Sequence, residues 1–151
     1  PGPLEMTDTP EPDLKSRDAY VSWTSATIRY RDLDPNGHVN NGAINEFFED
    51  GRVQFRHEQM ITLGDDILAG FALVKFSVEY FKTLHYPGSV DIGTVVTKIG
   101  RTSYVLGQGI FSGDECIAVD EVITVCLDAE TQKSQPINDE LRAILENAQK
   151  L

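Results

Sequence analysis

The sequence has few basic residues and little cysteine, and it contains no long apolar run. Lysine and arginine together number 13 against 24 aspartates and glutamates, so the formal net charge is −11. This charge argues against non-specific nucleic-acid binding, which needs basic surface to displace counterions. No apolar run approaches the ~20 residues of a membrane-spanning helix, and no signal-peptide pattern is present. We therefore expect a cytoplasmic protein that binds neither nucleic acid nor membrane.

The two cysteines, Cys116 and Cys126, lie in a single apolar run. If this run is one extended strand, they are about 33 Å apart, too far for a disulfide. Reduced thiols fit a cytoplasmic protein, and we interpret both cysteines as small buried hydrophobic residues.

Several motifs of catalysis and cofactor binding are missing as well. There is no G-x-S-x-G, no phosphate loop and no G-x-G-x-x-G, and the three histidines lack the spacing of paired zinc ligands. The segment DLDPNG matches the first half of a calcium loop, but Ala43 occupies the twelfth position, where that loop needs a glutamate. We expect no metal and no redox cofactor.

Length and composition predict one domain with an N-terminal tail. The first 17 residues, PGPLEMTDTPEPDLKSR, are rich in Pro, Asp and Glu and poor in apolar groups, so we expect a disordered tail or an expression remnant there. The remaining residues, 18–151, have the length of a single domain.

Hydrophobic periodicity predicts an α+β fold. Residues 20–31 are typical of a strand, and a helical spacing follows at Ala43, Ile44, Phe47, Phe48, Gly51 and Phe55. Asn40 or Asn41 can cap this helix, and Gly51 on its apolar face suggests close approach to a sheet. Four strand segments follow (74–80, 89–99, 102–111 and 116–127), and their short connections favour an antiparallel meander. A short helix over 138–150 ends the chain. The order predicts one antiparallel sheet curled around one long helix.

The residues between the first strand and the long helix can support either a turn or a reaction. Asp34 lies a few residues before the helix cap, and a carboxylate there can attack a carbonyl or activate water. The N–H groups of a helix start can hold a developing oxyanion. Asp, Pro, Asn and Gly are equally good turn residues, so these residues alone leave both interpretations open.

The segment IRYRDLDPNGHVNNGAINEFFEDGRVQF, residues 28–55, resembles the opening of the hotdog-fold acyl-CoA thioesterases related to 4-hydroxybenzoyl-CoA thioesterase. That family shows R-Y/F-x-D-x-D-x-x-G-H-V-N-N, a short gap, and then two aromatic residues followed by E-x-x-R. The later strands and the final helix are also similar, so the resemblance covers about residues 22–145. It implies hydrolysis of an acyl-CoA ester to a carboxylic acid and coenzyme A. It also implies a homodimer or homotetramer with active sites at the dimer interface.

The resemblance assigns roles to particular residues. Asp34 takes the place of the catalytic carboxylate, and the backbone N–H of Asn41 would polarise the thioester oxygen. Glu49 would pair with Arg52 or face the substrate. Further substrate-binding positions are His38 and Asn40, which would line the pocket, and Arg101, which matches a region that meets the nucleotide phosphates.

Two departures from the family pattern bear on the substrate. Ile44 and Phe47 stand where the family often has tyrosines, which favours an aliphatic acyl group. Three alternatives stay open: an acyl-carrier-protein thioesterase, a thioester hydratase or dehydratase, and a non-catalytic acyl-CoA-binding protein. The spacing from Asp34 to His38 is one residue short of the hydratase pattern.

Overall fold

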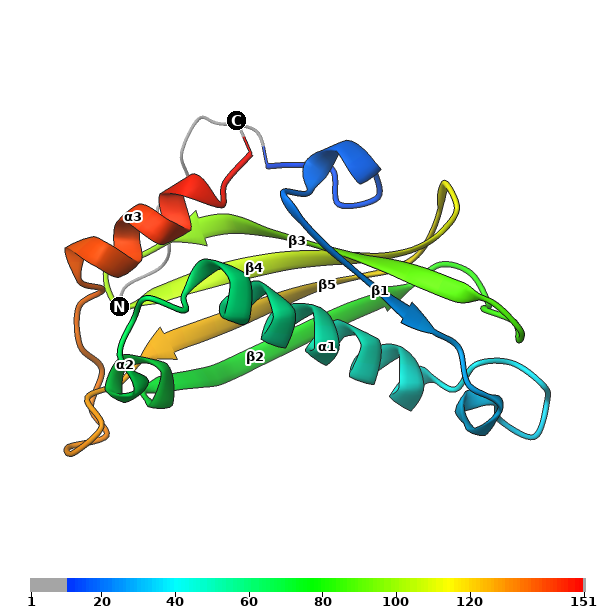
Figure 1. Cartoon of the computed structure of the whole chain (residues 1–151), viewed down its shortest axis with the longest axis horizontal. Helices are drawn as coiled ribbons and strands as arrows, with labels where there is room; N and C mark the ends of the chain where they lie inside the picture. Colours follow the sequence, from blue (N-terminus) through cyan, green and yellow to red (C-terminus); the bar gives the residue numbers. More distant parts are fainter. Residues whose placement is uncertain (1–10, 151) are drawn as a thin grey trace.

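The structure is a computed structural model that describes residues 11–150. One long helix lies along one face of a five-stranded antiparallel sheet (Figure 1), as the sequence predicts for an α+β fold. Within the described residues, no helix is long and apolar enough to cross a membrane. The elements in chain order are η1 (Arg17–Ala19), β1 (Ser22–Thr27), η2 (Tyr30–Asp32), α1 (Asn41–Gln59), α2 (Asp65–Ala69), β2 (Phe71–Tyr80), β3 (Ser89–Ile99), β4 (Ser103–Ser112), β5 (Glu115–Cys126) and α3 (Asp139–Asn147), where η marks a 3-10 helix.

The strands run in the order β1-β3-β4-β5-β2. The predicted meander is confirmed for β3, β4 and β5, which are joined by short hairpins. It is wrong for β2, which pairs with β5 at the edge of the sheet. The reason is that β3 already has β1 and β4 as neighbours, so β2 takes the free edge of β5. Residues 81–88 then carry the chain from that edge back to β3.

Helix α1 begins where the sequence predicts, with Asn40 as its cap. Its apolar face is buried against the sheet, and Gly51 marks the closest approach. A Cβ atom added at Gly51 would lie 2.6 Å from Cγ2 of Ile92 and 2.8 Å from Nε2 of Gln108. The expected packing role of this glycine is therefore confirmed.

A buried polar network lies between α1 and the sheet. Nη1 of Arg52 is 3.4 Å from Oδ2 of Asp120 and 3.3 Å from Oε1 of Gln108. The amide of Gln108 donates to the carbonyl of Phe48 and to the hydroxyl of Thr94. Burial raises the pKa of Asp120 to about 8, against the opposing charge of Arg52. This network fixes the rotation of α1 on the sheet.

The predicted tail, residues 1–17, divides into two parts. Residues 1–10 lie outside the described residues, whereas residues 11–17 include Leu14, which packs on the sheet face opposite α1. Leu14 and Tyr20 pack there, and the hydroxyl of Tyr20 donates to the carbonyl of Leu14. The side chain of Tyr20 fits only because Gly93 and Gly109 carry no side chain, since a Cβ at Gly93 would lie 2.5 Å from its Cγ and a Cβ at Gly109 would clash with its hydroxyl oxygen.

Candidate active site

Residues 32–40 form a small hairpin immediately before α1. Leu33 and Val39 pair across it. The N–H of Asp34 donates to the carbonyl of His38 at 2.8 Å, and the N–H of Asn40 donates to the carbonyl of Asp32 at 2.8 Å. These bonds fix the turn at residues 34–38 relative to the first residues of the helix.

The carboxylate of Asp34 is half-buried in this turn. Its Oδ1 accepts backbone N–H groups from Asn36 at 2.9 Å and from His38 at 3.1 Å, the bonding typical of a turn aspartate. Within residues 11–150, Oδ2 accepts no hydrogen bond from a side chain or a turn. One oxygen therefore orients the carboxylate, and the other is free to meet water or substrate.

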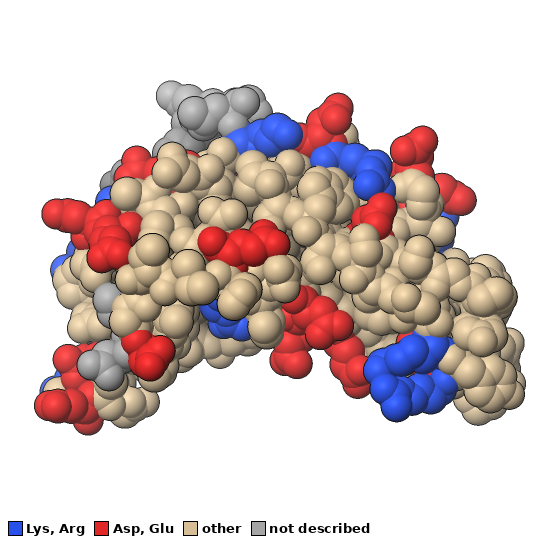
Figure 2. All heavy atoms as spheres, viewed as in Figure 1, with Lys and Arg blue, Asp and Glu red and all other residues tan. Residues whose placement is uncertain are grey.

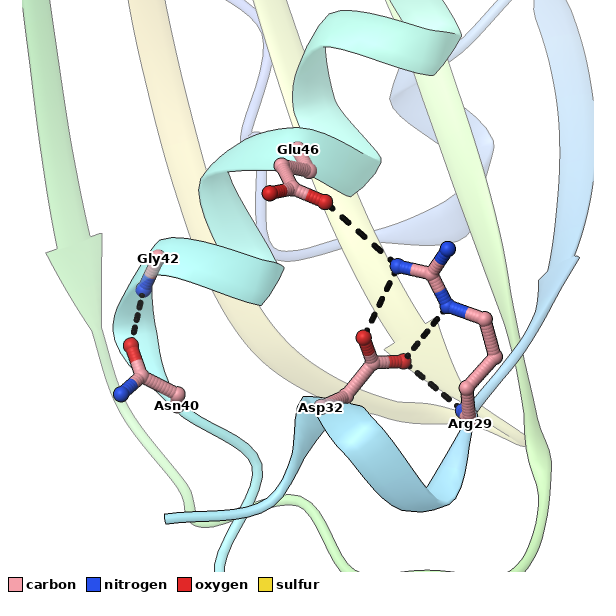
Figure 3. A network of polar contacts seen from close by, with 5 residues as sticks. All are labelled: Arg29, Asp32, Asn40, Gly42 and Glu46. Atoms are coloured by element: carbon pink, nitrogen blue, oxygen red, sulfur yellow. Dashed lines mark hydrogen bonds and ion pairs between the residues drawn. The ribbon is translucent and has the colours of Figure 1, made fainter.

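The start of α1, which follows the hairpin directly, offers a free donor. The side chain of Asn40 accepts the N–H of Gly42 at 2.6 Å (Figure 3), which is the cap that the sequence predicts. Asn41 is the first helical residue, so its N–H has no acceptor within the helix. The partial positive charge of a helix start favours a developing oxyanion at this N–H.

An ion-pair network of Arg29, Asp32 and Glu46 lies at the base of the hairpin. Asp32 is buried, and it accepts the backbone N–H of Arg29 at 2.7 Å and its Nη2 at 2.9 Å (Figure 3). Burial would raise the pKa of Asp32, but the hydrogen bonds from Arg29 outweigh it and hold this pKa below its usual range. Glu46 lies 3.4 Å from the same guanidinium. These contacts give Asp32 a structural role at the base of the hairpin.

The loop 81–88 lies against the other side of the hairpin. Val39 donates its N–H to the carbonyl of Leu84 at 2.9 Å, and His38 bridges to His85. Their rings meet edge to face with centroids 5.2 Å apart. Sequence reasoning missed His85 because only this long-range pairing brings it to the site. Within the described residues, no three His, Cys, Asp or Glu side chains come together as a metal site would need.

Glu49 lies on the exposed side of α1, away from Asp34. It lines an open hollow of about 450 Å³ between β1 and α1, whose other lining residues are Ala26, Thr27, Arg29, Glu46, Phe47 and Asp50. The predicted Glu49–Arg52 pair is not formed among the described residues, since the ion-pair partner of Arg52 is Asp120.

Arg101 is exposed in the turn between β3 and β4, next to α3. The hairpin of Asp34 lies at the other end of β3, where Ser89 pairs with Thr27. Eleven residues of strand at about 3.3 Å each separate these ends. A single chain therefore does not bring Arg101 and Asp34 together.

A five-stranded antiparallel sheet curled along one long helix is the architecture of the hotdog fold. Comparison with known proteins agrees. Residues 28–145 match the Thioesterase-like superfamily, and the chain belongs to this family. The acyl-CoA thioester hydrolase YbgC of Escherichia coli O6:H1 is 26% identical over 115 residues, which cover 73% of this chain and 84% of that protein.

Solved structures show the same fold. The PA5185 protein of Pseudomonas aeruginosa superposes with a TM-score of 0.78 at 24% identity, covering 93% of this chain and 98% of that one. A thioesterase of Thermus thermophilus, solved in complex with coenzyme A and zinc, gives a TM-score of 0.75 at 22% identity, covering 86% and 95%.

Proposed function

We propose that this protein hydrolyses acyl-CoA thioesters to a carboxylic acid and free coenzyme A. The observation that carries the proposal is the hairpin of Asp34. It holds one carboxylate oxygen by two backbone N–H groups and leaves the other free, and the hairpin leads directly into α1. Membership of the thioesterase-like superfamily supports this proposal, as does the similarity to the acyl-CoA thioester hydrolase YbgC of Escherichia coli.

The chemistry follows from two groups. The thioester oxygen accepts the N–H of Asn41, where the helix start stabilises negative charge. Oδ2 of Asp34 then attacks the carbonyl carbon, coenzyme A leaves as a thiolate, and water hydrolyses the resulting mixed anhydride. In the other route, Asp34 takes a proton from a water molecule that attacks the carbon directly. Both routes give the same products.

The apolar residues near the start of α1 favour an aliphatic acyl group. Ile44 and Phe47 are buried apolar residues on α1, and neither offers a hydroxyl that would hold a polar aromatic acyl group. His38 and Asn40 lie in the same hairpin as Asp34, and the ring of His85 packs edge to face against that of His38. Glu49 faces the neighbouring hollow.

The free edge of the sheet favours assembly. Strand β2 pairs on one side only, and Leu73 and Val74 on it are 50% and 58% exposed. An unpaired strand edge with exposed apolar side chains readily pairs with another strand. We propose a homodimer, or a homotetramer built from it, with active sites at the dimer interface. We also propose a cytoplasmic location.

The test follows thiol release from acyl-CoA esters of short to long aliphatic chains, with benzoyl and phenylacetyl esters alongside. Asp34→Asn keeps the shape of the side chain and removes its charge, so activity should fall ~10²-fold or more. Asp114→Asn, in the exposed turn between β4 and β5, is the matched control and should keep full activity.

Two outcomes would contradict the proposal. Equal activity of Asp34→Asn and the wild type would place the reaction on another residue. If the wild type releases no thiol from any of the coenzyme A esters, acyl-CoA hydrolysis is rejected. Acyl-carrier-protein esters, a hydratase assay and ligand retention without thiol release would then separate the remaining candidates.

A further inference from the structure

A polar pair links α1 to the edge strand β2. The hydroxyl of Tyr80, the last residue of β2, donates to Oδ1 of Asn45 in α1 at 3.0 Å. Tyr80 is 38% exposed and Asn45 is half-buried, so both can meet a ligand. Among residues 11–150, Nδ2 of Asn45 donates no hydrogen bond. The pair therefore offers an amide donor and a hydroxyl oxygen that can still accept.

The pair lies beside the start of α1. Asn45 follows Asn41 by four residues, so the two occupy the same flank of the helix, one turn or ~5.4 Å apart. Side chains of a helix lean toward its N-terminus, so the amide of Asn45 covers the turn that begins at Asn41. The backbone N–H of Asn41 is the donor proposed for the thioester oxygen. A group attached close to that thioester therefore lies within reach of the pair.

The side of β2 that faces the core continues as apolar surface beyond the pair. Val78 and Phe76 precede Tyr80 at alternate positions of the strand, and both are half-buried and pack against the core. The ring of Phe76 meets that of Phe48 in α1 edge to face, with centroids 6.4 Å apart. An acyl chain that leaves the thioester along this flank meets the polar pair first and apolar side chains afterwards. This order fits an aliphatic chain with one polar group near its thioester.

The charges around the pair favour a neutral polar group over a carboxylate. Lys82, two residues after Tyr80, is already paired with Glu115. Figure 2 shows acidic side chains spread over the face on which α1 lies in Figure 1, and the whole chain has a net charge of −11. This field would repel a second carboxylate on the acyl group. A hydroxyl group carries no charge and is not repelled.

We propose that Asn45 and Tyr80 select acyl-CoA esters that carry a hydroxyl group on C3 of the acyl chain. Nδ2 of Asn45 donates to the substrate hydroxyl, and that hydroxyl donates in turn to the oxygen of Tyr80. An oxo group has no hydrogen to donate and could form only the first of these bonds. C3 lies close enough to the thioester for a side chain that leans back over the first turn of α1. This inference rests on the proposed function, because it names the substrate class of that same site.

The arrangement also predicts that one enantiomer is preferred. The backbone N–H of Asn41 holds the carbonyl oxygen, the polar pair holds the hydroxyl, and the apolar tail lies along β2. Only one hand at C3 satisfies all three contacts while the thioester faces Asp34. A site that hydrogen-bonds a substrate hydroxyl discriminates against an analogue that lacks it, because the polar groups of the site are then left unpaired.

The test measures kcat/KM for both enantiomers of a 3-hydroxyacyl-CoA and for the unsubstituted acyl-CoA of the same chain length. The wild type should prefer one enantiomer to the unsubstituted ester about tenfold or more. Tyr80→Phe removes only the hydroxyl, and Asn45→Leu replaces the amide with an apolar group of similar size. In each variant, the ratio of kcat/KM for that enantiomer to kcat/KM for the unsubstituted ester should fall toward one. Tyr30→Phe removes an exposed hydroxyl on η2 and should keep the wild-type ratio.

Equal hydrolysis of all three esters by the wild type would overturn the inference and leave the proposed function standing. A wild-type preference that survives both substitutions would overturn the assignment to Asn45 and Tyr80. An equal loss on all three esters would make the pair a structural link between α1 and β2 and would overturn the inference too. So would a change of oligomeric state in either variant, which would make the pair a contact between copies. If no coenzyme A ester is hydrolysed at all, the proposed function fails and the inference fails with it.

Discussion

Gly51 sets how closely α1 approaches the sheet, and replacing it with alanine tests this packing. The substitution adds one methyl group on the buried face of the helix. In an exposed helix it would stabilise by about 1 kcal/mol, because alanine is the better helix former. Here the new Cβ would lie 2.6 Å from Cγ2 of Ile92 and 2.8 Å from Nε2 of Gln108.

The clash outweighs the gain in helix propensity. Ile92 is fully buried and β-branched, so it has little freedom to move, and overpacking a core costs about 1–3 kcal/mol. Displacing Gln108 also weakens its bonds to the carbonyl of Phe48 and the hydroxyl of Thr94, which contribute about 1 kcal/mol each. We expect a net loss of about 1–3 kcal/mol in the free energy of unfolding.

Urea denaturation measures this loss. For Gly51→Ala the midpoint should fall by roughly 1 M at an unchanged slope. Gly64→Ala is the control, since no atom lies within 4 Å of a Cβ there, and its midpoint should stay close to wild type. Combined with Ile92→Ala, which removes the clashing atom, Gly51→Ala should cost about 1 kcal/mol less than it does alone. Strict additivity, or a Gly51→Ala variant more stable than wild type, would refute the close approach.

The remaining predictions concern two side chains that hold backbone N–H groups. Asp32→Asn should lower the free energy of unfolding by about 1–2 kcal/mol at pH 7, because Arg29 loses its charged partner. Since the folded-state pKa of Asp32 is depressed, its contribution is present above pH ~4 and is lost as pH falls through that lowered pKa. The free energy of unfolding should therefore fall less steeply with decreasing pH in the variant than in the wild type. If both proteins lose the same stability in acid, the Arg29–Asp32 pair does not make this contribution. Asn138→Ala removes the side chain that accepts the N–H of Leu141 at 2.8 Å and should cost about 0.5–2 kcal/mol in thermal unfolding; an unchanged melting temperature would argue against this cap.

The elements with strong local signals could be predicted from the sequence. Helix α1 follows from the spacing of its apolar residues and from the cap at Asn40. Strand β3 has the predicted bounds, and β4 and β5 are shifted by one residue each. Helix α3 lies within the predicted range 138–150, and Asn138 caps it. Periodicity and capping act between near neighbours, which is why a single sequence reveals them.

Strand β2 shows where local patterns fail. The alternation over residues 74–80 predicts that Val74, Phe76, Val78 and Tyr80 share a buried face. Phe76 and Val78 do pack against the core, but Val74 is 58% exposed. The register shifts between Leu73 and Lys75, and such a bulge leaves one residue out of the alternation. The strand also starts three residues earlier than predicted, at Phe71. Pairing with β5 decides both features, and the sequence of β2 alone does not contain that pairing.

The same long-range pairing explains which site residue the sequence left out. Asp34, His38, Asn40 and Asn41 all lie within residues 34–41, in the hairpin and the first position of α1, so one motif reveals them together. His85 reaches this hairpin only because β2 lies at the far edge of the sheet. From that edge the chain must return past the start of α1 to enter β3, and on the way Leu84 accepts the N–H of Val39. Had β2 paired with β3 in a simple meander, the connection would have been a tight hairpin, and His85 would lie away from Asp34. The wrong placement of β2 and the omission of His85 from the candidate active site therefore have the same cause. The observed strand order corrects both.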